Sequence, residues 1–595
     1  MRSVLWGVIG TVLLVSCGPG PSSGEEPPQR PASVMEPEPV SEPATPVPSV
    51  PPEEPEEPVP APPPPPVFVP RWPALQTQVE HFELSFDKET WRRINDPRTA
   101  REYAPGRFKA RGVEYVVGLR LRGDQARSHP KLSWKVKLPE GVKLDGMRRL
   151  NFLAEWLDAG YLTDAFSYEL MHASGAYSPR ARYALLTVNG RYEGIFTLVE
   201  QVDKPFLKAH GLDSDGSVYR CGSKDCELKL TPPAHYQKPW SKKTNEDQPW
   251  DELHTFLWKL SRTPEHEFED FLRQHFELDA YLRYMAVGAL ISLGGIDDSG
   301  SYLVHDRSVD KWLYVPWDLN NTPMQLRRSE AVGTSPSVDR SIPAFTLYDT
   351  FMERTYEHKE RKYGGAHLPF SVLSQRIWDC PPLRNRVLDH LKQLLETVFT
   401  QEAVARRAGD QHALIRELLQ GDPYVQRPVA RYAPEFLERY AAGRRDFLAR
   451  QIPLERRRGE GGVVINGFGL PPGTAVGTNG EVSGYIDLYN REDKPMRVGG
   501  MTFTDNLRRQ FKHRLPRGLE VPPHGTLRLY ADGRPGAGPT HLPFKLQAGG
   551  GELGLFDGKR MTGVVDVTFY APLSPGRAYG RIPDGAERWD WRTAR

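Results

Sequence analysis

Proline dominates the first part of this chain and limits what that part can form. From Pro19 to Pro70, 21 of 52 residues are proline, and nine glutamates against the single Arg30 give a net charge of −8. Proline fixes its own φ and has no backbone N–H, so such a segment cannot build a helix, a sheet or a packed core. We therefore expect residues 18–70 to form an extended, polyproline-II-like stalk.

An export signal precedes the stalk. Met1-Arg2 is followed by an apolar stretch from Val4 to Val15, which is shorter than the ~20 residues that a membrane span needs. The sequence that follows, Leu14-Val15-Ser16-Cys17, resembles a bacterial lipobox. We expect residues 1–17 to direct export and Cys17 to carry a lipid anchor, which would tether the protein to the bacterial cell envelope, at the outer membrane or cell surface. An ordinary signal peptide with an incidental cysteine is the alternative.

The rest of the chain has the composition of a folded protein. The whole sequence is 38% hydrophobic and 10% aromatic, and its net charge is +2, which leaves +9 for residues 71–595. A mildly basic body without clustered base-contacting arms does not favour a dedicated nucleic-acid binder, so we expect no nucleic-acid partner. No later apolar segment approaches spanning length, which excludes a polytopic membrane protein.

Periodicity divides this body into an α+β domain, residues 71–455, and a smaller all-β domain, residues 460–590. Alternating apolar residues predict strands in 80–138, and in 115–122 and 133–138 the charged side chains share the opposite face. Those charges are Arg120, Arg122, Lys135 and Lys137. A solvated strand face is the alternative to an anion site.

Further elements follow in order along the chain. We expect a helix over about 162–171, a hairpin turning at Asn189-Gly190, helices in 251–293, a strand pair at 302–304 and 312–315, and helices in 382–452. After residue 463, short strands between Gly and Pro residues predict a β-sandwich.

The cysteines predict one crosslink. Cys221 and Cys226 lie five positions apart, and in an oxidising compartment this spacing favours a local disulfide. A zinc half-site is the alternative, although no second Cys/His pair with ligand spacing is present. Cys380 is left over and is expected to be a buried thiol.

Acidic residues around the predicted 302–315 hairpin are the strongest sign of chemistry. The chain has no Gly-x-Ser-x-Gly, no Gly-x-x-x-x-Gly-Lys-Ser/Thr and no His-Glu-x-x-His motif. Asp297 and Asp298 precede the hairpin, and Asp318 and Asn320 follow it, so the hairpin would bring these side chains together. Convergent carboxylates repel unless a cation or proton lies between them, and hard oxygen ligands suit Mg²⁺. Structural turn carboxylates are the alternative.

Several segments in order resemble the CotH family of atypical protein kinases. They are Arg122-Gly123 with Pro130-Lys131-Leu132-Ser133-Trp134-Lys135, Val188-Asn189-Gly190 with Leu198-Val199-Glu200, and Pro316-Trp317-Asp318-Leu319-Asn320. The resemblance covers about residues 80–455. It departs from the family pattern at Gly300-Ser301, where many relatives have Asn, and at Asn320, where they have a second Asp.

This resemblance implies a two-lobe, kinase-like domain that binds ATP and Mg²⁺ and phosphorylates Ser or Thr of surface or coat proteins. Asp318 would bind metal, with Asn320 as a second ligand, and Asp297 or Asp298 would accept the substrate proton. Arg122 and either Lys131 or Lys135 would hold the phosphates. Glu200 would mark the hinge beside the adenine or pair with a lysine. A catalytically inactive adhesin or scaffold with the same fold is the rival interpretation.

The C-terminal strands resemble a lamin-tail domain, which implies an immunoglobulin-like sandwich. The segments that carry this resemblance include Ile465-Asn466, Tyr485-Ile486-Asp487-Leu488-Tyr489-Asn490 and Gly580-Arg581-Ile582-Pro583-Asp584-Gly585. Such a domain would dock to a protein or a surface rather than catalyse a reaction.

Overall fold

A computed structural model describes most of the chain from Phe68 onward. The described residues are 68–123, 125–221, 228, 236–237, 239–293, 300–320, 322, 324–326, 328, 372–456, 462–506, 509, 511–558, 564–570, 572–586 and 589–594. They belong to one compact unit, residues 67–595. This unit contains both helices and strands, so the predicted α+β class is confirmed. In the described part, no helix is both long and apolar enough to cross a bilayer.

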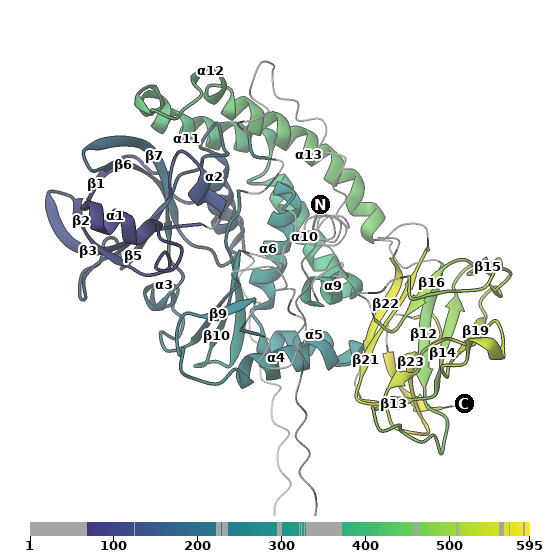
Figure 1. Ribbon diagram of the computed structural model, residues 1–595. Helices are drawn as coiled ribbons and strands as arrows, with labels where there is room; N and C mark the ends of the chain where they lie inside the picture. The colour runs from purple at the N-terminus through teal and green to yellow at the C-terminus, as the bar shows by residue number, and fades with distance from the viewer. Residues whose placement is uncertain are drawn as a thin grey trace, which may run out of the picture. The chain divides into compact units, whose positions relative to one another are not determined.

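Seven strands close into a barrel in the order β1-β2-β3-β4-β5-β7-β6 (Figure 1). They are β1 Glu80–Ser85, β2 Ala104–Ala110, β3 Val113–Leu121, β4 Trp134–Lys137, β5 Arg149–Leu153, β6 Ala181–Val188 and β7 Arg191–Glu200. Alternate side chains such as Leu119, Val136 and Phe152 fill its interior. The predicted hairpin is β6–β7, and both turn residues have the positive φ that a type I′ turn requires: 49° at Asn189 and 78° at Gly190.

Short elements flank this barrel. Helix α1 (Lys88–Asn95) begins at Asp87, whose side chain accepts a hydrogen bond from the backbone N–H of Thr90. A 3₁₀ turn, η1 (Gln125–Ser128), lies between β3 and β4. Helix α2 ends where Gly175 adopts a φ of 77°, as the sequence predicted for the Gly175 region.

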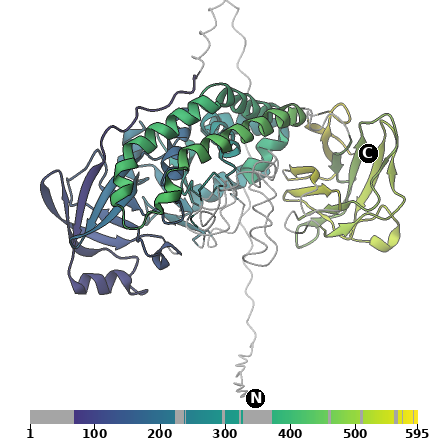
Figure 2. The same ribbon diagram turned by 90° about the horizontal axis from the view of Figure 1, so that it is seen from above.

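Helices and a second sheet follow the barrel. The helices are α2 Thr163–Ser174, α3 Lys204–Ala209, α4 Asp251–Arg262, α5 Glu265–His275, α6 Leu278–Ile291, α9 Val372–Asp379, α10 Pro381–Glu396, α11 Gln401–Gly421, α12 Arg427–Ala430 and α13 Ala433–Arg456. The sheet has the order β11-β10-β8-β9, with β8 Ser217–Cys221, β9 Trp240–Lys242, β10 Ser301–Asp306 and β11 Lys311–Pro316. Figure 2 shows the long helices α11 and α13 side by side.

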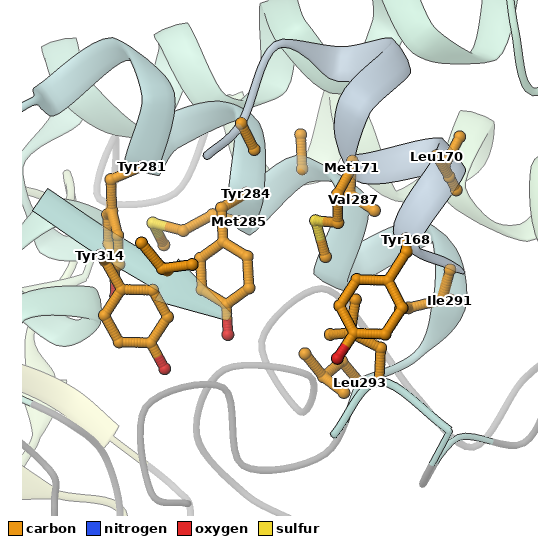
Figure 3. Close-up of a cluster of buried hydrophobic side chains, with 14 of the residues drawn as sticks. Tyr168, Leu170, Met171, Tyr281, Tyr284, Met285, Val287, Ile291, Leu293 and Tyr314 are labelled. Carbon is orange, nitrogen blue, oxygen red and sulfur yellow. The ribbon is translucent and has the colours of Figure 1, made fainter. Parts of the chain in front are cut away.

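One large core joins these helices to the second sheet. Figure 3 shows Tyr168 and Met171 of α2, Met285 of α6 and Tyr314 of β11 within it. The rings of Tyr284 and Tyr314 lie with their centres 4.9 Å apart. Helix α6 is almost entirely buried, because eleven apolar residues and a glycine leave few polar side chains between Leu278 and Ile291. The second sheet is therefore packed against α2 and α6 in one core.

The C-terminal strands form two main sheets around their own core. The sheets are β19-β14-β12-β23-β24 and β17-β16-β21-β22. Their strands are β12 Val463–Gly469, β14 Gly484–Asn490, β16 Thr502–Thr504, β17 His513–Arg514, β19 Thr526–Ala531, β21 Gly551–Phe556, β22 Val564–Tyr570, β23 Arg577–Arg581 and β24 Trp589–Thr593. Buried residues of both sheets, such as Ile486 and Leu555, share one cluster.

Smaller elements complete this part of the chain. They are the strand pairs β13 Glu481–Val482 with β20 Leu546–Gln547 and β15 Met496–Arg497 with β18 Glu520–Val521, and the 3₁₀ turn η3 Pro535–Ala537. The immunoglobulin-like and lamin-tail assignments, and the boundary between residues 455 and 460, stay predictions.

Candidate active site

The outer face of three neighbouring barrel strands is strongly basic. Arg120 on β3 lies directly opposite Lys135 on β4, and Lys137 lies opposite Arg149 on β5. Between the two lysines, Val136 points into the barrel core, so the predicted separation of charged and apolar faces is confirmed. Like charges directly opposite each other destabilise a sheet. Two such pairs on one face are costly for folding, and a bound anion would remove that cost.

This face contributes to a cavity of about 610 Å³, a size within the ~300–1,000 Å³ of typical small-molecule sites. Its cationic lining residues are Arg101, Arg120, Arg122, Arg127, Lys135, Arg149, Arg220 and Lys243. Among the described lining residues, only Asp203 and Glu246 are acidic, which leaves a surplus of six positive charges. Tyr103, Trp240 and Tyr302 add aromatic surface. The cavity is therefore suited to a polyanion that carries an aromatic group.

Lys135 is buried within this positive charge. Its Nζ donates a hydrogen bond to Oε1 of Gln201, whose Nε2 donates to the hydroxyl of Tyr302 at 3.0 Å. Burial lowers the pKa of Lys135 well below its ordinary value, and the charges of Arg122 and Arg120 lower it further. An anion beside Lys135 would offset all of these effects.

Asp318 follows β11 and Trp317 in a conformation that few residues adopt. Its φ is 66°, in the left-handed region, which Asp and Asn tolerate better than most side chains. Gly300, at the start of the same hairpin, lies against it. A Cβ at Gly300 would come 2.8 Å from Cβ of Asp318 and 2.7 Å from the carbonyl oxygen of Trp317. Any larger residue would clash there, which gives the departure at position 300 a structural reason.

Arg122 connects Asp318 to the basic cavity. Its guanidinium carbon lies 4.3 Å from the ring centre of Trp317, and Nη1 is buried without a hydrogen-bond partner among the described residues. Burial lowers the pKa of Arg122 to about 10. Asp318 is exposed, yet desolvation by the surrounding protein raises the pKa of its carboxyl group, while the charges of Arg122 and Arg220 oppose the rise. A buried guanidinium with an unused donor is unusual and indicates a missing acceptor.

Asp318 also adjoins two buried carboxyl groups. Glu155 is 6% exposed and Asp164 is 1% exposed. Burial raises the pKa of Glu155 to about 7, and burial together with the charges of Glu155 and Asp318 raises the pKa of Asp164 well above its ordinary value. The Nδ2 of Asn320 donates to Oε2 of Glu155 at 3.0 Å. The side chain of Asp164 shares a hydrogen bond with that of Glu155 and has no other hydrogen-bond partner in the described residues.

Asp318 thus lies where a basic cavity meets buried acids. Mg²⁺ is commonly held by one or two carboxylates, with phosphate oxygens and water as its remaining ligands. In the part of the chain that the structure describes, no three Asp, Glu, His or Cys side chains form a metal site by themselves. The residues present therefore fit a cation that is shared between the protein and the phosphates of a ligand.

Comparison with known proteins identifies the family. Residues 119–448, more than half of the chain, match the family described as CotH kinase protein. The chain belongs to the CotH kinase protein family. It is also similar to the inner spore coat protein H of Bacillus subtilis (strain 168), with 23% identity over 366 residues that cover 59% of this chain and 91% of the relative.

Within the CotH kinase segment, the two lysines considered for phosphate binding have different surroundings. Lys135 lines the cavity, whereas Lys131 is fully buried away from it. The Nζ of Lys131 lies 3.2 Å from Oδ2 of Asp422, at the end of α11, and 3.1 Å from the hydroxyl of Tyr161. Burial lowers the pKa of Lys131 to about 8. Lys131 therefore ties the barrel to α11 and does not reach the cavity.

Glu200 also lies outside the cavity. Its carboxylate forms an ion pair with Arg180, with Oε1 and Nη2 2.7 Å apart, and it is 2% exposed. The lysine partner considered for it is thus replaced by an arginine. The next residue, Gln201, lines the cavity and holds Lys135.

Only some of the remaining predicted residues lie in the part of the chain that the structure describes. Asp297, Asp298, Cys17 and Cys226 lie outside the described residues. The convergence of the first two with Asp318 therefore stays a prediction. Cys221 is disulfide-bonded. Cys380 has a free thiol, and burial raises its pKa to about 12.

The residues of this site that sequence reasoning missed include Glu155, Asp164, Arg149 and Arg220. The signal for Glu155 was an acid inside an apolar run, between Ala154 and Trp156. Nothing in the local sequence marked Arg149 or Arg220, because their relation to Lys135 arises only when β5 pairs with β4 and the second sheet brings Arg220 of β8 near Lys135.

Proposed function

We propose that this protein is a kinase of the bacterial cell envelope that transfers the γ-phosphoryl group of ATP to Ser or Thr of a surface or coat protein. The observation that carries the proposal is the position of Asp318, next to both the basic cavity and the carboxyl groups of Glu155 and Asp164. Membership of the CotH kinase family supports the same class of activity. Phosphoryl transfer needs positioned phosphates, a metal charge and an oriented hydroxyl.

The side chains have distinct roles in this proposal. Lys135, Arg122 and Arg220 bind and orient the triphosphate, since each presents a positive charge to the cavity. Asp318 and Asn320 would hold Mg²⁺, and Oδ1 of Asn320 would be the ligand atom because its Nδ2 donates to Oε2 of Glu155. When bound, Mg²⁺ neutralises charge on the β- and γ-phosphates.

Aromatic side chains and a proton-accepting carboxylate complete the proposed site. Tyr103 and Trp240 offer ring faces for the base of the nucleotide. The proton of the acceptor hydroxyl passes to a carboxylate, which the family resemblance assigns to Asp297 or Asp298.

Transfer of labelled phosphate from ATP in the presence of Mg²⁺ tests this function on the full chain. We expect the protein to label itself, and Asp318→Asn to reduce the rate by at least ~100-fold, as the loss of one preorganised electrostatic group does in other enzymes. Asp310→Asn is the matched control, because Asp310 lies at the other end of the β10–β11 hairpin and also has a positive φ, 51°. Equal labelling of wild type and Asp318→Asn, or no labelling and no ATP binding by wild type, contradicts the proposal.

We further propose that a lipid on Cys17 keeps the protein at the envelope, based on the sequence Leu14-Val15-Ser16-Cys17. Cys17→Ala should move the protein from the membrane fraction to the soluble fraction. Cys380→Ala, which removes a thiol in the folded part, should leave it with the membranes. Sedimentation of Cys17→Ala with the membranes counts against the anchor.

A further inference from the structure

The basic cavity carries more positive charge than a metal-bound nucleotide requires. Its described lining has six surplus positive charges. A nucleoside triphosphate bound to one divalent cation has a net charge of about −2 at neutral pH. The cavity volume of about 610 Å³ suits one such ligand. About four positive charges are therefore left for another anionic group near the same site.

Ion pairs within the protein do not neutralise this surplus of positive charge. Arg149 pairs with Asp203 at 2.9 Å, and Arg127 donates to backbone carbonyls of Gly123 and Ala100. Six other cations of the lining have no ion pair within the described residues. They are Arg101, Arg120, Arg122, Lys135, Arg220 and Lys243.

The unpaired cations extend from the barrel to the second sheet. Arg101 precedes β2 and is exposed, and Lys243 follows the last residue of β9. Burial is the largest cause that lowers the pKa of Lys243, and the positive charges of Arg220 and Arg120 add to it. Together they bring this pKa to about 8. Lys243 is therefore close enough to Arg220 and Arg120 to feel their charges, and Arg101 lines the same cavity.

We propose that the acceptor of this site is an acidic peptide segment that contains Ser or Thr, with its carboxylates bound by Arg101 and Lys243. This inference rests on the proposed function. The acceptor hydroxyl oxygen forms a bond to the γ-phosphorus, the bond from that phosphorus to the β–γ bridging oxygen breaks, ADP leaves with the electron pair, and the hydroxyl proton is released. Charge complementarity raises the rate of encounter with acidic segments and disfavours basic ones.

The chain itself supplies a suitable probe. Residues 33–49 contain Ser33, Ser41, Thr45 and Ser49, three glutamates and no basic residue. A synthetic peptide of this sequence is compared with one in which Glu36, Glu38 and Glu42 are replaced by lysine.

The full-length protein should phosphorylate the glutamate peptide with a kcat/KM at least about tenfold above that for the lysine peptide, and the ratio should fall as salt screens the charges. The double variant Arg101→Glu/Lys243→Glu should invert the ratio, a readout that a general loss of activity leaves unchanged. Equal rates, a preference for the lysine peptide, or no transfer to either peptide overturns this inference.

The proposed function is judged separately. A wild-type protein that labels itself, or the lysine peptide, while ignoring the glutamate peptide retains the kinase function and loses only the acidic acceptor. The ratio of the kcat/KM values for the two peptides is measured on the wild-type protein. A folding defect in the double variant therefore does not affect this test.

Discussion

Arg122 lies over the ring of Trp317, with its guanidinium carbon 4.3 Å from the ring centre. This contact joins the end of β3 to the residue that follows β11, so a barrel strand and the second sheet meet beside Asp318. The two residues are 195 positions apart in the chain. Nη1 of Arg122 is buried and has no hydrogen-bond partner in the described residues, and Arg122 also lines the cavity.

Replacing Arg122 by lysine should weaken ATP binding although the charge is retained. Lysine lacks the planar group that stacks on Trp317, and such contacts contribute ~0.5–2 kcal/mol. We expect Arg122→Lys to raise the dissociation constant for Mg–ATP by about tenfold in isothermal titration calorimetry. Arg92→Lys, on the exposed face of α1, is the control and should not change it. Unchanged affinity in Arg122→Lys would show that stacking plays no part.

Lys135→Met should weaken ATP binding but stabilise the ligand-free protein. The change removes a charge that lies opposite Arg120, so the ligand-free protein should gain about 0.2–1 kcal/mol in the free energy of unfolding. ATP affinity should fall by at least about tenfold, because the charge also lines the cavity. Urea denaturation and calorimetry measure the two effects. In the control, Lys137→Met, a lysine is removed from the same strand outside the cavity, and ATP affinity should hardly change. Similar losses of affinity in both variants would contradict the role given to Lys135.

Asp422→Asn should destabilise the fold strongly. It leaves Lys131 buried without its ion-pair partner, and breaking such a buried pair typically costs ~3–5 kcal/mol. Chemical denaturation followed by circular dichroism measures this loss. The double variant Lys131→Met/Asp422→Leu should recover much of the stability, because no unpaired charge remains. If Asp422→Asn costs less than about 1 kcal/mol, the pair does not hold the barrel to α11.

His390 should make the folded state sensitive to mild acid. Burial, together with the charges of Arg283 and Arg386, lowers its pKa to about 4, while Asp279 and Asp389 oppose this shift. The unfolded chain binds this proton near pH 6.5 and the folded chain only near pH 4, so stability is lost as the pH falls between these values. The loss is at most about 3 kcal/mol.

Urea denaturation at pH 7 and pH 4.5 tests this linkage. His390→Gln should reduce the difference in unfolding free energy between the two pH values, because glutamine has no proton to bind. An equal difference in variant and wild type would mean that other groups cause the acid sensitivity.

Local sequence predicted the elements that local chemistry determines. Asn189-Gly190 specified the β6–β7 turn, and alternation in 115–122 and 133–138 placed the basic side chains on one face of the barrel. These features depend on neighbours in the chain or on strand period alone. The strand pair that ends before Asp318 was found for the same reason.

Distant contacts were beyond such reasoning. Lys131 and Lys135 are four residues apart and look equivalent in sequence. Only Lys131 forms an ion pair with Asp422, which lies 291 positions after it in the chain. Glu155 and Asp164 become part of the site only because the fold places their buried carboxyl groups near Asp318, which raises their pKa values. Which charge is buried, and against what, is decided by tertiary packing.

A structure of the protein with Mg²⁺ and a non-hydrolysable ATP analogue tests the central claim most directly. We expect the triphosphate in the basic cavity beside Lys135 and Arg122, with the cation bound by Asp318. A nucleotide bound elsewhere, or a cation with no contact to Asp318, would contradict the account.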